Sequence, residues 1–287
     1  MIQDIKLKNI VSLLPFLISL IFYLLTVCPT LYIGDDGEVV SAAHTLGICH
    51  PPGYPLFTVL GKIFTYLPLS NIAYRVNLVP AFFAALSVLF LCLLLSKISR
   101  FMFKPENSKA VNLISLASSL IFAFSLTFWS QSLHAKGGIY TLNAFFILAL
   151  FYVLINNSPY FFGLLLGLSL TNHHTATMFI PIFLIYIYIY RKDWIKWEVI
   201  KNILLLFLVG ISMYLYLIIR ANAKPPMNWG DPYNIGRAIY HIFRKQYGEI
   251  SKLSHTMQSF NEMALVYWNW FIKEFTPYLL IFIPVGI

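Results

Sequence analysis

The chain alternates long apolar runs with short polar segments. The eight longest apolar runs are Ile10–Cys28, Val76–Ile98, Ala110–Trp129, Thr141–Ile155, Tyr160–Leu170, Thr175–Tyr190, Ile203–Ile219 and Met263–Ile287. A helix needs about 20 apolar residues to cross the hydrocarbon core of a bilayer. The pattern therefore predicts an all-α, polytopic membrane protein of about eight transmembrane or half-spanning helices, with one domain over residues 1–287. The last run stops at the chain end after about half a bilayer, so we also expect the chain to be truncated within a span.

Basic residues gather in alternate connections between these runs. They lie at the N-terminus, in the segment 97–109 and in the segment 191–201. Short cytoplasmic loops carry an excess of Lys and Arg, so we expect these three segments on the cytoplasmic side. The extracytoplasmic loops are then about 29–75, 129–140, 171–174 and 220–262. All seven histidines fall in these outer loops, which predicts one extracytoplasmic site.

Composition limits the classes of protein that fit. Only 11% of the residues are charged and 59% are hydrophobic, whereas soluble domains carry about 25% charged residues. This excludes a soluble enzyme, and it excludes a nucleic-acid partner in spite of the net charge of +9. The three cysteines have no metal-ligand spacing, and nucleotide-binding glycine motifs are missing. We therefore expect neither a bound metal nor a cofactor.

Tyr160–Leu170 is too short to cross the bilayer. At 1.5 Å per residue it rises only about 16 Å, against about 30 Å of hydrocarbon. The polar turn that follows should lie below the outer surface, where polar groups persist only inside protein or in a wet cavity. We predict that Asn172, His173 and His174 in this turn bind substrate. Adjacent helical side chains point in different directions, so a metal site at the two histidines is disfavoured.

Three acidic residues stand together in the first outer loop: Asp35, Asp36 and Glu38. One interpretation is structural, because Asp35 can cap a helix and Glu38 can close a capping box. The other is catalytic, with a carboxylate acting as general base on a hydroxyl that attacks a sugar C1. The two interpretations are compatible, since a cap fixes the position of the carboxylate.

Further candidate substrate-binding residues are polar or aromatic side chains of the outer loops. They are His50, Tyr54, Lys136, Tyr140, Arg220, Trp229 and Asp231. Each also has an ordinary interpretation: a rigid proline corner at His50, snorkelling or lipid contact for the cations, and interface anchoring for the aromatic residues. In a recessed site, the guanidinium of Arg220 would suit a phosphate leaving group.

Several motifs, in order, resemble a bacterial membrane family of unknown-function domains whose eukaryotic relative is a transmembrane protein O-mannosyltransferase. The resembling segments are 34–38, 50–55, 75–77, 128–131, 140–143, 167–174 and 228–232. The resemblance implies the C-type glycosyltransferase fold, a polyprenyl-phosphate-linked sugar donor and inversion at the anomeric carbon. It also implies a catalytic carboxylate at Asp35. The family commonly has serine where this chain has Asp36, and glutamate where it has Gly138.

Two functions from different classes follow. The first is a membrane glycosyltransferase that moves a hexose such as mannose from a polyprenyl-phosphate donor to a hydroxyl of a protein Ser/Thr or a glycan. It would work on the extracytoplasmic side of a bacterial inner membrane, among membrane lipids. The second is a transporter or flippase of a lipid-linked or small anionic substrate, which would also explain recessed His and Arg side chains. A carrier requires access from both faces, whereas the polar residues gather on one.

Overall fold

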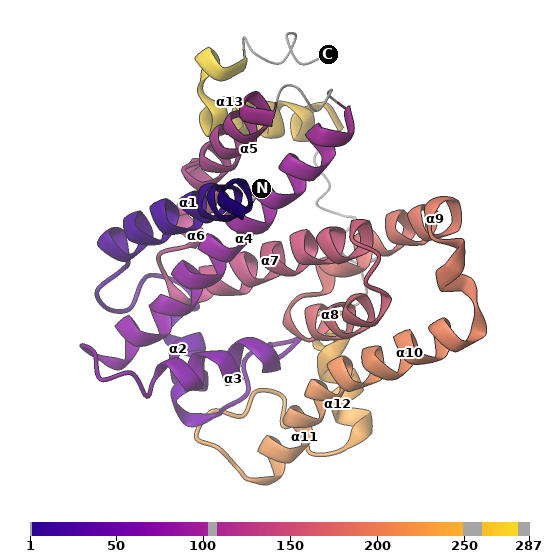
Figure 1. Cartoon of the computed structure of the whole chain (residues 1–287). Helices are drawn as coiled ribbons and strands as arrows, with labels where there is room; N and C mark the ends of the chain where they lie inside the picture. The colour runs from indigo at the N-terminus through magenta and orange to yellow at the C-terminus, as the bar shows by residue number, and fades with distance from the viewer. Residues whose placement is uncertain (1, 103–107, 249–259, 281–287) are drawn as a thin grey trace.

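The computed structural model describes residues 2–102, 108–248 and 260–280 (Figure 1). Within these ranges all regular structure is helical, apart from one isolated bridge between Ile48 and Asn228. The all-α prediction is therefore confirmed for the part of the chain that is described.

The helices follow one another closely along the chain. The first seven are α1 (Ile2–Thr26), α2 (Asp36–Thr45), α3 (Pro55–Phe64), α4 (Ile72–Met102), α5 (Ser108–Ala123), α6 (Leu126–Gln131) and α7 (Ala135–Ile155). Then come α8 (Pro159–Asn172), η2 (His174–Phe179), α9 (Ile180–Tyr190), η3 (Lys192–Ile195), α10 (Trp197–Ile211), η4 (Ser212–Tyr214) and α11 (Leu215–Asn222). The last are α12 (Ile235–Ile242), η5 (Lys245–Tyr247) and α13 (Phe260–Leu280).

Three described helical segments are long and apolar enough to cross a membrane. They are Ile72–Phe101, Ala135–Ile155 and Trp197–Asn222. Four shorter apolar helices accompany them: Leu13–Thr26, Pro55–Phe64, Lys109–Ala123 and His174–Tyr190. These helices support a membrane protein, while the count of eight spans stays a prediction. The expected truncation within the last span concerns residues 281–287, which lie outside the described residues.

The predicted run Ala110–Trp129 is two helices rather than one. Helix α5 ends at Ala123, and α6 begins after Ser125, whose backbone is extended (φ −61°, ψ 142°). The Tyr23 hydroxyl donates to the Ala123 carbonyl at 2.8 Å, which satisfies an acceptor at the end of α5. The apolar pattern continues across this break and therefore did not predict it. Most of the predicted outer loop 129–140 is consequently helical, in α6 and the start of α7.

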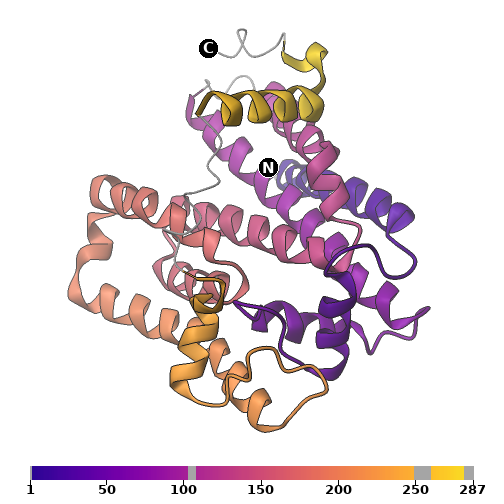
Figure 2. The same ribbon diagram turned by 180° about the vertical axis from the view of Figure 1, so that it is seen from behind.

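Helix α7 lies at the centre of the molecule, against α4 and α8 (Figures 1 and 2). Val76 and Val79 of α4 form a buried core with Ile139 and Leu142 of α7, joined by Phe57 of α3. This core holds the N-terminal part of α7 against α2 and α3, the short helices within the predicted outer loop 29–75.

Glycines bring α8 and α10 into close contact. A Cβ atom on Gly163 would lie 2.4 Å from the Ile203 carbonyl oxygen, and one on Gly167 would lie 2.3 Å from that of Phe207. Both distances are shorter than van der Waals contact, so only glycine permits this approach. Small residues four apart are the usual means by which helices pack backbone to backbone in membranes.

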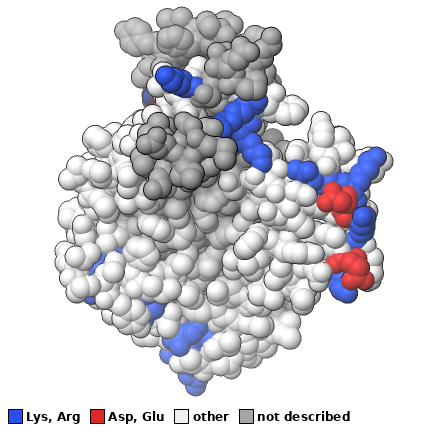
Figure 3. Space-filling model, viewed as in Figure 1, with Lys and Arg blue, Asp and Glu red and all other residues white. Residues whose placement is uncertain are grey.

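The two ends of α7 carry different chemistry. At its C-terminal end, Arg191 donates to the Ile155 carbonyl at 2.7 Å, and Lys97 donates to Asn156. The predicted acidic site lies at the N-terminal end, described below. The helix has 21 residues, so about 31 Å separate the two ends. Figure 3 shows that most of the surface on one face carries no charged side chain, as a lipid-facing surface requires.

Candidate active site

Helix α2 begins beside two carboxylates that have opposite surroundings. The Asp35 side chain is 52% exposed, whereas Asp36 is fully buried. The side chain of Asp35 makes no capping hydrogen bond to α2, and Glu38 bonds to His50 instead of reaching back to the helix start. The predicted capping box is therefore wrong, because residues distant in sequence supply partners for both carboxylates.

Asp36 forms hydrogen bonds that connect the first outer loop to the start of α7. Its Oδ1 accepts hydrogen bonds from the Lys136 backbone N–H at 2.8 Å and from His134 Nδ1 at 2.9 Å. Its Oδ2 accepts one from the Tyr32 N–H at 3.0 Å. Burial alone raises the pKa of Asp36, but these hydrogen bonds outweigh it and hold the pKa below its usual value. Asp36 is thus a buried, ionised anchor with its oxygens already occupied.

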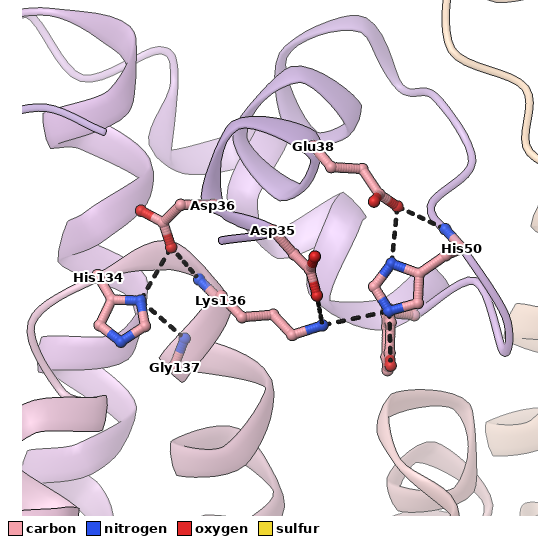
Figure 4. Close-up of polar contacts among 8 residues, drawn as sticks. Asp35, Asp36, Glu38, His50, His134, Lys136 and Gly137 are labelled. Carbon is pink, nitrogen blue, oxygen red and sulfur yellow. Dashed lines mark hydrogen bonds and ion pairs between the residues drawn. The ribbon is translucent and has the colours of Figure 1, made fainter. Parts of the chain in front are cut away.

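The side chain of Lys136 joins Asp35 to His50 (Figure 4). Its Nζ lies 2.9 Å from Asp35 Oδ2, 3.2 Å from His50 Nε2 and 5.3 Å from the ring centre of Tyr54. The hydrogen bond from Lys136 holds the pKa of the Asp35 carboxyl below its usual value, although burial acts in the opposite direction. A half-exposed carboxylate and a largely buried ammonium therefore face the same space.

Glu38 orients the imidazole of His50. Its Oε1 accepts hydrogen bonds from both the backbone N–H of His50 and Nδ1, the latter at 2.9 Å. Burial acts to raise the pKa of Glu38, but the two hydrogen bonds from His50 outweigh this effect. The pKa is therefore below its usual value, and the carboxyl is ionised. With Nδ1 donating to Glu38, Nε2 is an acceptor, and it faces the Lys136 ammonium. The proline corner that contains His50 thus presents one fixed ring nitrogen to the site.

The aromatic and histidine residues extend the cluster toward the end of α8. The Tyr54 ring is stacked parallel to that of His173, with ring centres 6.3 Å apart and planes at 9°. The half-exposed Tyr140 meets the same imidazole edge-on at 5.8 Å. Burial lowers the pKa of His173 to about 4, so its ring is neutral near pH 7. His174 instead contacts the Tyr214 hydroxyl at 3.2 Å.

Asn172 lies deeper than the histidines that follow it. It is fully buried, its Nδ2 donates to the Ile139 carbonyl at 2.9 Å, and its Oδ1 has no partner. The recess of this turn below the outer membrane surface stays a prediction, as does a substrate contact for Asn172 or the two histidines.

Arg220 does not lie beside Asp35, although both belong to the outer loops from which one extracytoplasmic site was predicted. It donates from Nε to the Leu46 carbonyl at 2.7 Å and from Nη2 to that of Thr45 at 3.3 Å. These carbonyls lie at the C-terminal end of α2. The last carbonyls of a helix have no partner within the helix, and they attract cations. Asp35 precedes the same helix, whose ten residues separate its two ends by about 15 Å. A phosphate contact for Arg220 stays a prediction.

Trp229 and Asp231 belong to a loop that pairs with the corner before His50. Trp229 N–H donates to the Ile48 carbonyl at 3.2 Å, and Ile48 N–H donates to that of Met227 at 2.9 Å. Asp231 accepts from Asn228 at 2.8 Å, while the Trp229 side chain is 46% exposed. The loop therefore borders the site without a described contact to Asp35.

Comparison with known proteins identifies the family. The model of the protein O-mannosyl-transferase TMEM260 N-terminal domain matches residues 35–197, more than half of the chain. The chain belongs to this family. The resemblance predicted from the motifs is confirmed, and the match begins at Asp35, the residue to which the resemblance assigns catalysis.

Two curated relatives carry the family name. The protein O-mannosyl-transferase TMEM260 of Mus musculus is 29% identical over 233 residues, which are 76% of this chain and 31% of the relative. The protein of the same name from Dictyostelium discoideum is 26% identical over 262 residues, which are 82% of this chain and 30% of the relative. The chain thus spans about a third of the length of these relatives. No solved structure matches it.

Two residues that contribute to the site in this family member were not among the sequence candidates. His134 binds Asp36, and Asn77 fixes the start of α7 by accepting from the Ala135 N–H at 2.8 Å. Asn77 also donates to the Cys28 and Thr30 carbonyls at 2.9 and 2.8 Å. A polar residue inside an apolar run was the available signal for Asn77, since buried amides need partners.

Gly138 is explained by packing. A Cβ atom there would lie 2.4 Å from the ring of Phe57. The glutamate that the family commonly has at this position would therefore require Phe57 to move. Among the described residues, no three His, Cys, Asp or Glu side chains gather so as to hold a metal ion. Lys136 supplies a positive charge to the cluster.

Proposed function

We propose that this protein is a membrane glycosyltransferase of the C-type fold that moves a hexose, mannose in the first instance, from a polyprenyl-phosphate donor to a hydroxyl. The acceptor would be a protein Ser/Thr or a glycan. The single observation that carries the proposal is the ion pair between the exposed Asp35 and Lys136, 2.9 Å apart at the N-terminal end of α7. The names of the curated relatives support a protein acceptor and a mannosyl donor.

Asp35 is suited to act as general base. It is ionised, half exposed and not committed to helix capping. In the proposed step, the acceptor oxygen attacks C1 of the sugar while its proton passes to the Asp35 carboxylate. The bond between C1 and the phosphate oxygen breaks, and the phosphate leaves with the electron pair. Attack opposite the leaving group inverts the anomeric carbon.

Lys136 is suited to receive the phosphate charge. Its ammonium already lies between a carboxylate and an imidazole nitrogen, and a preorganised cation stabilises a charge that develops on the leaving group. When the donor phosphate takes part of the Lys136 interaction, the pKa of Asp35 rises toward its usual value. The carboxylate then becomes a stronger base at the moment when the acceptor is deprotonated.

The other side chains of the cluster hold these two in place. Glu38 fixes His50, and His50 limits where the Lys136 ammonium can lie. Tyr54, Tyr140 and the neutral His173 present ring faces and edges that we assign to contacts with the sugar or the lipid phosphate. We assign Asp36 to positioning, because its oxygens are already occupied.

The basic residues at the opposite end of α7 support an extracytoplasmic site. Lys97 and Arg191 lie about 31 Å from the acidic cluster along the helix axis. Basic loops remain cytoplasmic, so we place the reaction outside the cytoplasm, at the inner membrane of a bacterium. The grouping of polar side chains at one end favours transfer over a carrier that opens to both faces.

The test uses the full chain with a polyprenyl-phosphate mannose and a Ser/Thr peptide. Asp35→Asn should abolish transfer with little change in melting temperature. Asp35 is half exposed, the amide oxygen that replaces its carboxylate can still accept from Lys136, and partly exposed ion pairs contribute only about 1 kcal/mol. Glu198→Gln is the matched control: Glu198 is an exposed carboxylate that pairs with Lys201 at 2.8 Å. Transfer by Asp35→Asn at the rate of the Glu198→Gln control would refute the proposal.

A further inference from the structure

The imidazole of His173 is held by hydrogen bonds to only one of its two ring nitrogens. Nδ1 accepts from the Thr175 backbone N–H at 3.3 Å and lies 2.8 Å from Thr175 Oγ1. His173 is the residue that caps the start of η2, so these contacts are built into that turn. A backbone N–H can donate but cannot accept. Nδ1 is therefore the acceptor, and the single proton of the neutral ring lies on Nε2.

The surroundings of His173 keep this ring neutral. Burial lowers its pKa to about 4, and the positive charges of His174, Arg244 and Lys136 act in the same direction. A neutral imidazole has one donor nitrogen and one acceptor nitrogen. Because Nδ1 is the acceptor, His173 can meet a ligand at Nε2 only as a donor.

A side chain of α7 holds the Thr175 hydroxyl in this arrangement. Asn143 Nδ2 donates to Thr175 Oγ1 at 3.0 Å. A hydroxyl that accepts one hydrogen bond still has its own proton to donate, and His173 Nδ1 lies within reach of it. The hydrogen bonds thus run from Asn143 through Thr175 to His173. They join α7 to η2, so two elements of the fold set the orientation of the ring.

The Nε2 side of the ring is open. No described residue forms a hydrogen bond with Nε2, and Nε2 is not one of the buried polar atoms that lack a partner in the described chain. The ring stacks on Tyr54 and meets Tyr140 edge-on. Lys136 Nζ lies 5.3 Å from the centre of the same Tyr54 ring. A ligand that reaches Nε2 is therefore next to the aromatic ring that also contacts the Lys136 ammonium.

We propose that Thr175 is a positioning residue that fixes His173 as a neutral hydrogen-bond donor, and that Nε2–H donates to a phosphate oxygen of the lipid-linked donor. The identity of the ligand rests on the proposed function. Lys136 and Arg244 add positive potential around His173, which favours an anionic oxygen over a sugar hydroxyl. A hydrogen bond to an ionised acceptor is also stronger than one between neutral groups. Lys136 then supplies charge to the phosphate, and His173 supplies a directed hydrogen bond.

Nitrogen NMR of the full chain, labelled with ¹⁵N-histidine, tests the state of the ring without any ligand. Protonated and bare ring nitrogens have well-separated chemical shifts, and the signals that vanish in His173→Phe belong to His173. We expect a protonated Nε2 and a bare Nδ1 near pH 7. A protonated Nδ1, with Nε2 either bare or also protonated, would overturn the proposal.

Binding of a short-chain prenyl phosphate, which carries no sugar, tests the ligand and the role of Thr175. Thr175→Val keeps the shape of the side chain but removes the hydroxyl, whereas Thr175→Ser keeps the hydroxyl. His173→Phe keeps an aromatic ring against Tyr54 and removes Nε2–H. Thr177→Val is the matched control, because Thr177 also lies in η2 but donates to the His174 carbonyl at 2.7 Å.

We expect wild type, Thr175→Ser and Thr177→Val to bind the prenyl phosphate alike. His173→Phe should bind about tenfold more weakly, a change of about 1.4 kcal/mol that is typical of one lost hydrogen bond. Thr175→Val should bind about threefold more weakly, because the backbone N–H still reaches Nδ1 but the ring is less firmly oriented. Its His173 nitrogen signals should also move toward the average of the two tautomers, and Thr175→Ser should restore them.

Three binding results would overturn the proposal. They are no binding of the prenyl phosphate by wild type, equal binding by wild type and His173→Phe, and a loss in His173→Phe that affects methyl α-mannopyranoside but not the prenyl phosphate. Binding and nitrogen signals of Thr175→Val that match wild type would remove the positioning role of Thr175. Neither measurement needs turnover, so a chain that transfers no sugar would still answer both.

Discussion

Asp35 and Asp36 are neighbours in sequence, yet we expect their amide variants to fail in different ways. In Asp36→Asn, the amide oxygen can still accept from the Lys136 N–H and from His134. The new amide N–H group faces the Tyr32 N–H, so one hydrogen bond to a charged acceptor is lost and two donors oppose each other. Such a loss in a fully buried position is worth about 1.5–3 kcal/mol. Asp35→Asn loses only a partly exposed ion pair.

Thermal unfolding of the purified variants measures the difference. A domain of this size loses about 2–4 °C in melting temperature for each kcal/mol, so Asp36→Asn should melt about 3–12 °C below wild type. Asp35→Asn should melt within about 4 °C of wild type, the shift that corresponds to about 1 kcal/mol, and transfer no sugar. Equal melting temperatures for wild type and Asp36→Asn would refute the assignment of Asp36 as a buried anchor.

Three further predictions follow from the same contacts. Lys136 keeps the pKa of Asp35 low, so activity that needs the Asp35 carboxylate should persist to a pH below the usual carboxyl range. In Lys136→Met, the residual activity should be lost at a higher pH on acidification than in wild type. An unchanged pH profile would contradict this. Glu38→Gln can still accept from its histidine partner and should melt near wild type, whereas Glu38→Ala should lose about 1–3 kcal/mol, seen as a lower melting temperature. Gly167→Ala should lower the free energy of unfolding by about 1–3 kcal/mol, because the methyl group separates α8 from α10. Gly37→Ala, which has no atom near its Cβ, should not lower it. Equal melting temperatures for the two variants would argue against the close helix contact.

The pH dependence of stability has a definite sign. The pKa values of Asp35, Asp36 and Glu38 are all lowered in the folded protein. Each carboxylate therefore contributes stability that is fully present above its unfolded pKa and is lost as the pH falls through its folded pKa. The buried Asp36 should contribute most, so the acid sensitivity of Asp36→Asn should be smaller than that of wild type.

The apolar runs predicted the helical class and the positions of the long helices. Val76–Ile98 lies within α4, and Thr141–Ile155 lies within α7. The break between α5 and α6 was missed because its residues are themselves apolar or small, so the hydrophobic pattern continues through it. The start of α7 was missed because a distant amide, that of Asn77, fixes it.

The sequence predicted many residues of the candidate site but few of the hydrogen bonds between them. The outer loops were expected to form one site, and the structure brings together four of the candidate residues: Asp35, His50, Tyr54 and Lys136. The partners of Asp36 and Glu38 could not be predicted, because local helix signals favoured a capping box over contacts across the fold. Arg220 was expected in the cluster, but the free carbonyls at the end of α2 hold it elsewhere.

Transfer of labelled mannose from a polyprenyl phosphate to a Ser/Thr peptide, with the anomeric configuration of the product read by NMR, tests the central claim most directly. Wild-type protein should form an inverted product, and folded Asp35→Asn protein, melting as wild type does, should form none. Product formed at equal rates by both proteins, or with retained configuration, would contradict the role of Asp35 as the general base of an inverting transfer.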